Sequence, residues 1–455
     1  MIKISVIYLF LNYCLGKKVD MSMVVTNLDW RQLYTFASNQ AILGFSFDGI
    51  NRLGQEYPDE LKQNPIGREL LMNWMGIAQQ IRRQNMKVNA VAGKLFAMLR
   101  EDGMRCCVLK GQGNALMYPN PYSRNPGDID VWINASRERI MEYAQKRFEL
   151  GDDIRLQHLE TSLDGVPVEL HFFPCSMNNP IYHLRLQKWF RRNVDLQCSH
   201  IVSLPDGAGD IAIPTSPFNV VYQLTHLYHH FFDEGVGMRQ IIDYFLVVND
   251  FSKNVFWNNN SSKITPSLFT LKEGSTSHPA PLTLRGEGGN RPTRCSEPLR
   301  SKDGGPSKVS PDCAGWDRRD AIEDTSSASG SSTAVTSSAS TALDVVQREL
   351  KHLGLWKFAG AVMFVLHEVL GLSEEKMIAP MDEKRGKLLL AEILNGGNFG
   401  QHFTKYAGFT HQSMGKKYFL KIWRNMHFVR YYPAEALSEP IFRTWHFFWR
   451  MKNKK

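Results

Sequence analysis

Hydrophobic periodicity changes at Gly103, and this change restricts the folds that the chain can adopt. Over residues 30–100 the apolar positions recur at helical spacing, as Leu70, Trp74 and Ile77 do. Gly103 is a residue typical of helix ends, and the apolar runs that follow it are short enough for strands. We predict four strands, over residues 105–109, 128–133, 154–162 and 166–173. The chain therefore combines a helical lead-in with a small sheet.

Turn and cap signals locate the ends of the predicted elements. Asp164-Gly165 separates the last two strands and is a strong hairpin signal, because both central residues of that turn type need positive φ. A helix is predicted from Arg137 to Phe148, and Ser216-Pro217 predicts a helix start with an N-cap followed by a proline. Another helix is expected from about Met238 to Val248. The predicted fold class is α+β, a small mixed sheet flanked by N- and C-terminal helices.

Composition divides the chain further. Residues 251–342 are rich in Pro, Gly, Asn, Lys and Ser, and such a segment buries too little apolar surface to offset the entropy of ordering. We predict a disordered insertion there, because helical periodicity resumes at Leu343, and we expect the later helices to pack on the earlier ones. The expected regions are an upstream extension (1–23), an N-terminal helical region (24–103), the catalytic sheet core (104–214), helices packed on it (215–250), the insertion (251–342) and a C-terminal helical region with a basic end (343–455).

The apolar run near the beginning of the chain has two interpretations. Residues 4–11 resemble the apolar part of a signal peptide, but only Lys3 precedes them and no small-residue cleavage site follows. This argues against a signal peptide, and Met21 or Met23 is an alternative start. Later in the chain, charged residues interrupt the apolar stretch from Trp356 to Leu372, so we expect a buried helix there and no membrane span.

Charge and cysteine content bear on partners and compartment. Residues 401–455 carry 11 Lys or Arg against 2 Glu, a net charge of +9 that equals the net charge of the whole chain. A basic end suits contact with phosphate-rich partners such as nucleic acid, and it is also a common solubilising tail. The seven cysteines form no CxxC pair, which argues against a disulfide framework and favours the reducing cytoplasm.

Two carboxylates on one predicted strand indicate a metal site. Asp128 and Asp130 are two residues apart, and the period of a strand turns both side chains to the same face. Two hard oxygen ligands of this kind can hold Mg²⁺ against a nucleoside triphosphate. A bare Asp-x-Asp pair is nevertheless expected by chance in a chain of this length. Its significance depends on the residues around it.

Glu169 and Lys110-Gly111 supply that context. Glu169 alternates with the apolar residues Val168 and Leu170, so it points away from the core and can add a third carboxylate as a shared ligand or as a proton acceptor. A solvent-facing strand glutamate would look the same. Lys110-Gly111 closes the first strand, where glycine lets the backbone approach a phosphate and lysine adds a point charge. Alone, this pair would be a surface loop.

Taken together, these motifs resemble a bacterial family of uncharacterised nucleotidyltransferases, type 5, in the DNA polymerase β-like superfamily. The likeness extends over nearly the whole chain outside the predicted insertion. The matching stretches are Val108-Leu109-Lys110-Gly111, Tyr118-Pro119, Arg124, Gly127-Asp128-Ile129-Asp130-Val131, Val168-Glu169-Leu170-His171, Arg239-Gln240-Ile241-Ile242-Asp243-Tyr244, Gly396-Gly397-Asn398-Phe399-Gly400 and Tyr432-Pro433 with Pro440, Phe442-Arg443 and Trp445.

The resemblance implies a minimal polymerase β-like sheet that binds an NTP together with Mg²⁺ or Mn²⁺. Asp128 and Asp130 would be the metal ligands and Glu169 the third acid. The superfamily usually has Gly-Ser where this chain has Lys110-Gly111, which puts the triphosphate contacts in doubt more than the metal site. In related toxin-like nucleotidyltransferases a lysine takes a comparable place.

Other charged residues have both a functional and a structural interpretation. Arg124 lies in a Pro/Asn-rich loop from which it can reach a phosphate, or it is a surface arginine. Arg239 and Asp243 are four apart on a helical face, where they pair with each other or Asp243 orients a basic group near the nucleotide. His226 and His230 could hold zinc, but a polar helix face turned towards the cleft explains them better.

The expected reaction is Mg²⁺-dependent transfer of a nucleoside monophosphate from an NTP to a hydroxyl, with release of pyrophosphate. The acceptor is a small molecule, a protein or an RNA, and the sequence does not select among them. The alternative from another class is a non-catalytic module that retains the fold and binds a nucleotide or a protein. A nuclease or phosphatase that uses the same carboxylates on water is a third.

Overall fold

A four-stranded mixed sheet with helices around it forms the centre of the fold. The computed structural model describes residues 4–150, 155–260, 341–401 and 414–453. The strands lie in the order β1-β2-β4-β3, with β2 parallel to β4 and both outer pairs antiparallel. Their bounds are β1 Cys106–Leu109, β2 Ile129–Ile133, β3 His158–Leu163 and β4 Val166–His171. The predicted α+β class with a small mixed sheet is confirmed.

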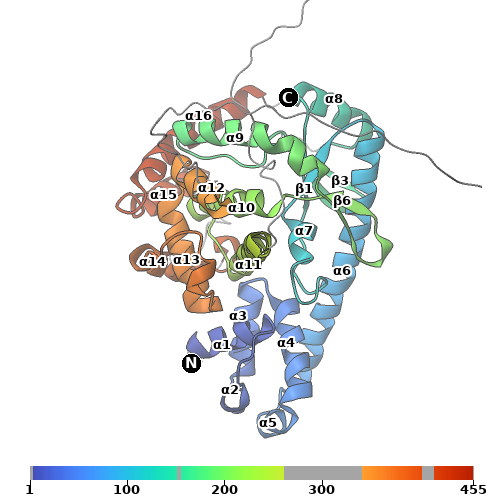
Figure 1. Ribbon diagram of the computed structural model, residues 1–455, viewed down its shortest axis with the longest axis vertical. Coiled ribbons are helices and arrows are strands. Elements are labelled where there is room, and N and C mark those ends of the chain that lie inside the picture. Colours follow the sequence, from blue (N-terminus) through green and yellow to red (C-terminus); the bar gives the residue numbers. More distant parts are fainter. Residues whose placement is uncertain (1–3, 151–154, 261–340, 402–413, 454–455) are drawn as a thin grey trace, which may run out of the picture. The chain divides into compact units, whose positions relative to one another are not determined.

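The helices before and within the sheet region make up the first half of the fold (Figure 1). Their bounds are α1 Ile4–Cys14, α2 Ser22–Thr26, α3 Trp30–Asn39, α4 Leu43–Glu56, α5 Pro58–Gln63, α6 Arg68–Glu101, α7 Gly111–Ala115, α8 Arg137–Arg147 and α9 Pro180–Ser199. A two-stranded sheet follows, made of β5 Ile201–Ser203 and β6 Asp210–Ala212 with the 3₁₀ turn Pro205–Gly207 between them. The strand predicted over 154–162 begins only at His158, and Ile154 lies outside the described residues.

The remaining described helices follow the sheet core. They are α10 Ser216–Asp233, α11 Met238–Asn260, α12 Ala342–His352, α13 Trp356–Leu370, α14 Glu383–Gly396, α15 Met414–Met426 and α16 Pro433–Asn453, with 3₁₀ turns at Glu374–Lys376 and Asn398–Gly400. Helices α12 and α13 contact α10 and α11, so the later helices do pack on the earlier ones. The glycine-rich stretch Gly396–Gly400 ends α14 in a sharp turn.

Two further predicted boundaries were wrong. The N-cap of α10 is Thr215, and Ser216 is its first helical residue, because the helix begins one residue earlier than the Ser216-Pro217 pair indicates. Helix α11 continues to Asn260, and Phe251 is buried, so the predicted insertion at 251 starts too early. The polar residues after Phe251 led to this prediction, although the helix continues through them. Residues 261–340 of that predicted insertion lie outside the described residues.

Helix α6 connects two hydrophobic cores. It has 34 residues, which makes it the longest described helix. Trp74 and Ile81 in its first half belong to the core formed by the N-terminal and C-terminal helices. Val88 and Leu99 in its second half belong to the core beneath the sheet. One continuous helix thus contributes to both cores, and Cys107, Leu109 and Trp132 of the sheet also belong to the helical core.

Helix α1 also belongs to this helical core. Phe10, Leu11 and Tyr13 are fully buried, and α1 contacts α4 and α13. Asn12 donates to the carbonyl of Val369 at the end of α13. The region predicted as an upstream extension thus packs against segments from both halves of the chain. No helix among the described residues is both long and apolar enough to cross a membrane.

Candidate active site

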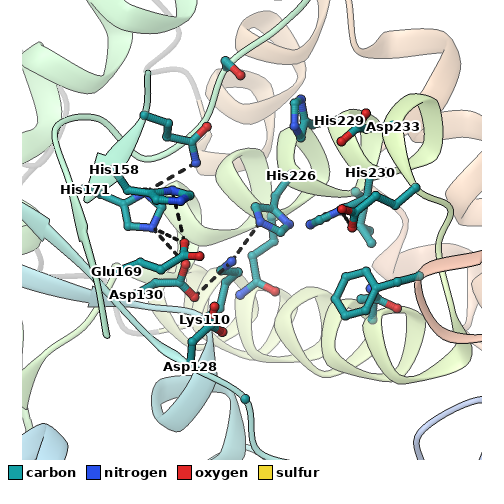
Figure 2. A pocket seen from close by; sticks show the side chains of 18 of the residues that line it. Lys110, Asp128, Asp130, His158, Glu169, His171, His226, His229, His230 and Asp233 are labelled. Carbon is teal, nitrogen blue, oxygen red and sulfur yellow. Dashed lines mark hydrogen bonds and ion pairs between the residues drawn. The ribbon is translucent and has the colours of Figure 1, made fainter. Parts of the chain in front are cut away.

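All eight residues singled out from the sequence line one cavity. It has a volume of about 570 Å³, within the range typical of small-molecule sites. The sheet contributes one side of this cavity, and α10, α11, α15 and α16 contribute much of the rest. Figure 2 shows the carboxylates of the sheet on one side and the histidines of α10 on the other. The eight residues are Lys110, Gly111, Arg124, Asp128, Asp130, Glu169, Arg239 and Asp243.

Strand register brings the three acids together. Asp130 lies directly opposite Glu169 in the parallel β2–β4 pair, so the two side chains project from the same face. Asp128 precedes β2 by one residue and reaches the same point. Carboxylate oxygens of Asp128, Asp130 and Glu169 lie within 4.8 Å of one another. This is a hard oxygen donor set of the kind that Mg²⁺ or Mn²⁺ prefers, so the residues present fit such an ion.

Lys110 bridges the two sides of the cavity. Its Nζ lies 3.0 Å from Asp130 Oδ2 and 2.8 Å from Nε2 of His226 on α10. Burial lowers the pKa of His226 far below its usual range, and the charge of Lys110 lowers it further, so the neutral ring can accept from the ammonium group. Burial alone would lower the pKa of Lys110, but the charges of Asp130 and Asp128 outweigh it and raise that pKa. Lys110 stays charged between the two walls.

The backbone at Lys110 and Gly111 explains how the lysine is held there. Lys110 has φ 51° and ψ −128°, a conformation that non-glycine residues rarely adopt and that costs on the order of 1–3 kcal/mol. Gly111 follows with φ 37°, in the region that favours glycine. The chain turns sharply between the end of β1 and the start of α7, which directs the lysine at Asp130. Non-glycine residues in sparsely populated backbone conformations cluster at functional sites.

His171 connects two of the acids. Its Nε2 lies 3.0 Å from Asp130 Oδ1 and 3.1 Å from Glu169 Oε2, so it donates to carboxylates on both strands. Gln157 Nε2 lies 3.4 Å from His171 Nδ1 and donates to the carbonyl of Pro174. Burial alone would lower the pKa of His171, but its hydrogen bonds to Asp130 and Glu169 outweigh burial and raise that pKa to about 9. These hydrogen bonds fix the relative position of the two acids.

The acids differ in protonation because their neighbours differ. The negative charge of Asp130, followed by burial, raises the pKa of Asp128 to about 6. Burial would also raise the pKa of Asp130, but Lys110 and His171 outweigh it and hold that pKa below its usual range. Burial would raise the pKa of Glu169 as well, but the hydrogen bond from His171 outweighs it and lowers that pKa. Pairs of acids whose environments separate their pKa values are typical of catalytic sites.

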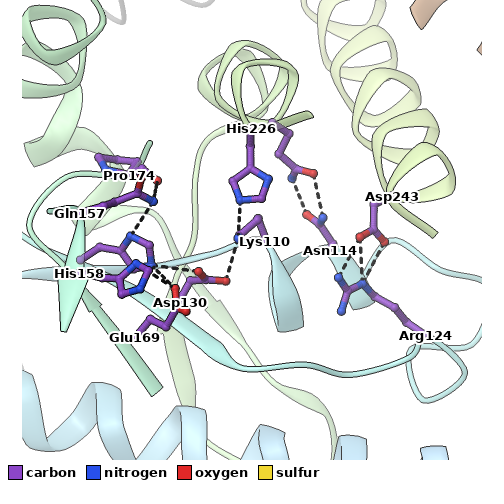
Figure 3. A network of polar contacts seen from close by, with 12 residues as sticks. Lys110, Asn114, Arg124, Asp130, Gln157, His158, Glu169, Pro174, His226 and Asp243 are labelled. Atoms are coloured by element: carbon purple, nitrogen blue, oxygen red, sulfur yellow. Dashed lines mark hydrogen bonds and ion pairs between the residues drawn. The ribbon is translucent and has the colours of Figure 1, made fainter. Parts of the chain in front are cut away.

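Arg124 is buried and bound to Asp243, which Figure 3 shows beside the carboxylate network. Its Nε and Nη2 lie 2.9 and 2.8 Å from the two oxygens of Asp243, and the hydroxyl of Tyr118 donates to Asp243 at 2.7 Å. The interpretation of Arg124 as a surface arginine was wrong. The partner of Asp243 comes from 119 residues away in the sequence, whereas Arg239 donates to the carbonyl of Asn125 at 3.2 Å.

The far side of the cavity contains residues that the sequence interpretation did not single out. Asp233 at the end of α10 accepts from Lys421 of α15 at 3.0 Å and from Arg443 of α16 at 2.8 Å. Lys421 and Arg443 outweigh the effect of burial and lower the pKa of Asp233. The histidines of α10 line this side, as expected for a polar helix face towards the cleft. No metal cluster on α10 is found among the described residues.

His158 was also missed. It lies on β3 directly opposite His171 of β4, and its side chain is buried against Glu169. The hairpin turn at Asp164-Gly165, with φ values of 49° and 71°, sets this register. Counting outward from the turn pairs residues 163 with 166 and 158 with 171. The signal needed to find His158 was therefore in the sequence.

Comparison with known proteins identifies the family of this α+β protein with its carboxylate cluster. The model of the uncharacterised nucleotidyltransferase family matches residues 26–266, and the chain belongs to that family. The resemblance noted from the motifs is thereby confirmed. The matched range holds all eight predicted residues, but it ends before α15 and α16, which supply Lys421 and Arg443 to the cavity.

Comparisons with curated proteins and solved structures do not extend the family assignment. No curated protein matches the chain. Among solved structures, the chain is similar to an antigenic nucleotidyltransferase-like protein from Paracoccidioides brasiliensis. That similarity has 15% sequence identity and a TM-score of 0.25, and it covers 35% of this chain and 75% of the other. The family assignment rests on the sequence match.

Proposed function

We propose that the protein transfers a nucleoside monophosphate from an NTP to a hydroxyl group and releases pyrophosphate. The observation that carries this proposal is the convergence of Asp128, Asp130 and Glu169 within 4.8 Å beside the ammonium of Lys110. A cavity of about 570 Å³ can hold a nucleotide, and membership of the nucleotidyltransferase family supports the same reaction class.

The three acids would hold Mg²⁺ or Mn²⁺ and leave the chain's other residues to bind and orient the substrates. When bound, the ion would neutralise charge on the phosphates. In the transfer, the acceptor oxygen bonds to the α-phosphorus while the bond from that phosphorus to the bridging oxygen of pyrophosphate breaks. The proton of the acceptor hydroxyl passes to a carboxylate oxygen of Glu169, whose pKa is held low enough to keep it ionised.

Cationic residues of the cavity would bind the triphosphate. Lys110 is a charged group that can turn from Asp130 towards a phosphate. Arg239 lines the same cavity, and among the described residues its Nε has no hydrogen-bond partner. Burial and then the charge of Arg124 lower the pKa of Arg239, and an anion beside it would offset both effects. Gly111 gives the backbone room to approach the phosphates.

Arg124 and Asp243 take a supporting role in this proposal. Two of the guanidinium nitrogens of Arg124 are bonded to Asp243, which leaves less of it for a phosphate. The pair holds the loop that leads from Arg124 to Asp128, and Asp243 also lies on the same helix as Arg239. We expect these two residues to position the loop and Arg239 around the nucleotide.

The compartment and the acceptor complete the proposal. Five cysteines of the described chain are free thiols, which supports a reducing compartment such as the cytoplasm. The acceptor is a small molecule, a protein or an RNA. The C-terminal region carries an excess of Lys and Arg and its helices border the cavity, which supports an anionic acceptor such as RNA.

A non-catalytic nucleotide-binding module is the second candidate. It is favoured by the observation that both oxygens of Asp130 already have side-chain partners, Lys110 on Oδ2 and His171 on Oδ1. A bound nucleotide would then pair with Lys110 without any metal chemistry. Hydrolysis of an NTP by water at the same acids is a further outcome of the experiment below.

Labelled NTPs distinguish these functions. Each NTP, labelled at the α-phosphate, is incubated with the purified protein, Mg²⁺ and a cell extract, and the products are separated as RNA, protein and small molecules. We expect the wild type to label an acceptor and the Asp128→Asn/Asp130→Asn variant to label none. The matched control is Asp164→Asn, at the tip of the hairpin, which should label as the wild type does. Equal labelling by all three proteins would contradict the transferase proposal, and labelled monophosphate alone would indicate hydrolysis.

A further inference from the structure

His158 is a buried imidazole without a hydrogen bond. Its exposed fraction is 7%, and neither Nδ1 nor Nε2 has a hydrogen-bond partner among the described residues. Burial, followed by the charge of His171, lowers its pKa to about 4, so the ring is neutral. Carboxylates lie near both ring nitrogens, with Glu169 Oε2 3.2 Å from Nδ1 and Glu160 Oε1 3.7 Å from Nε2, but neither contact has hydrogen-bond geometry. A buried polar group left unbonded raises the free energy of the fold, and a bound ligand would offset this.

The ring nitrogens of His158 and His171 converge on Glu169. His158 Nδ1 lies 3.2 Å from Glu169 Oε2, and His171 Nε2 lies 3.1 Å from the same oxygen. One ligand atom from each of the three residues lies within 4.8 Å of the others. Figure 2 shows the two rings side by side above the carboxylates. The set consists of two imidazoles and one carboxylate held on the adjacent strands β3 and β4.

We propose that His158, Glu169 and His171 form a second metal site, which takes a transition-metal ion of the Zn²⁺ type. Imidazole nitrogens suit such ions, whereas Mg²⁺ prefers oxygen ligands throughout. Two histidines and one carboxylate leave coordination positions open for water or substrate. Glu169 has two carboxylate oxygens, so it can be shared between this site and the acidic site of Asp128 and Asp130. The proposal does not depend on nucleotidyl transfer, since the donor set is present whatever reaction occurs.

Binding requires His171 to release one proton. The ion replaces the proton that Nε2 shares with Asp130 and Glu169, this proton passes to solvent, and the ring keeps its other proton on Nδ1. The amide of Gln157 then turns so that its oxygen accepts from Nδ1, and it gives up its bond to the Pro174 carbonyl. A metal-bound histidine whose other nitrogen donates to a side chain or carbonyl is the usual arrangement.

Cobalt binding tests the site without reference to activity. The chelator-treated protein is titrated with Co²⁺, whose visible absorption distinguishes imidazole-containing coordination from six oxygen ligands. We expect the wild type to give an imidazole-type spectrum and His158→Gln to lose it, with affinity reduced by at least about 10-fold. Asp128→Asn should keep the spectrum, because Asp128 belongs to the acidic site alone. The matched control Ser162→Ala, on the same face of β3 but nearer the hairpin turn, should bind as the wild type does.

Two outcomes would overturn the proposal. The first is equal spectra and affinities for the wild type and His158→Gln. The second is loss of the spectrum in His226→Gln and not in His158→Gln, which would place the ion on α10. Circular dichroism shows whether His158→Gln folds, and His158→Asn replaces it if it does not. Transfer activity can be absent while this site is confirmed, so the two proposals fail separately.

Discussion

The two sides of the cavity carry opposite arrangements of charge. On the sheet wall, which consists of Asp128, Asp130 and Glu169, three acids converge on one point. On the helix wall, which consists of Asp233 and Asp243, each acid faces an arginine at 2.8 Å. Opposite charges in contact satisfy one another, whereas converging like charges raise the free energy of the fold unless a cation joins them. The sheet wall has three acids for two cationic groups in contact with them, Lys110 and His171, so it is arranged for a further cation. The helix wall, where each acid is paired with an arginine, is arranged for stability.

The largest expected effect tests the sheet wall. Asp130→Asn should reduce the rate of nucleotidyl transfer by roughly 10³-fold, because a lost metal ligand removes several kcal/mol of charge stabilisation. Asp233→Asn should reduce the rate by less than about 10-fold, since Asp233 only pairs with Lys421 and Arg443. Single-turnover transfer with labelled NTP measures both. Similar losses in the two variants would abolish the distinction between the walls.

The next effect concerns the stability of the helix wall. Asp243→Asn leaves Arg124 buried without its charged partner and should lower the free energy of unfolding by about 3–5 kcal/mol. Asp164→Asn removes an exposed partner of Lys94 and should lower the free energy of unfolding by less than about 1 kcal/mol. Urea unfolding followed by circular dichroism gives both values. If Asp243→Asn lowers the free energy of unfolding no more than Asp164→Asn does, the helix wall is not the stabilising side.

Glu435 on α16 is a buried acid for which no ion pair is found among the described residues. It accepts from the backbone N–H groups of Asn178 and Asn179, and burial raises its pKa to about 7. The folded state therefore retains a proton that the unfolded state releases near pH 4.5. Stability should fall as the pH rises from about 4.5 to about 7, by on the order of 3 kcal/mol. Thermal melting across this range should show a shallower loss for Glu435→Gln, and parallel curves would contradict the assignment.

The smallest expected effect is the change in folding stability when Asp128 ionises. Because Asp130 raises the pKa of Asp128 to about 6, ionisation of Asp128 destabilises the fold as the pH rises from 3.8 through 6. Asp128→Asn should then be more stable than the wild type above pH 6, by no more than about 1 kcal/mol, because the side chain is partly exposed and solvent screens its charge. The two proteins should melt alike near pH 4. A lower melting temperature of the variant above pH 6 would show that Asp128 is stabilised by its neighbours.

Local patterns predicted the sheet wall better than the helix wall. Alternation along a strand identified Asp130 and Glu169, and the hairpin signal at Asp164-Gly165 was correct. The contact between Arg124 and Asp243 depends on how α11 packs against a loop 119 residues away, which no local pattern contains. The parallel pairing of β2 with β4, which places Asp130 opposite Glu169, is also a property of the tertiary fold.

Two groups of cavity residues were not predicted from the sequence, each for its own reason. His158 was missed because the register of the hairpin was not followed along β3, although the turn determined it. Asp233, Lys421 and Arg443 could not be found from spacing, since they come from α10, α15 and α16 and meet only when these helices pack. Sequence reasoning therefore reaches groups on neighbouring strands more readily than groups on separate helices.

Helix α6 has a consequence for how the molecule loses its structure. Its first half contributes Trp74 and Ile81 to the helical core, and its second half contributes Val88 and Leu99 to the core beneath the sheet. Because helix formation is cooperative along the chain, disorder in one half of α6 weakens the other. We expect amide protons of β2 and of α13 to exchange through the same global opening, with equal free energies. The acids of the sheet wall would then keep their mutual positions until the whole domain unfolds at once.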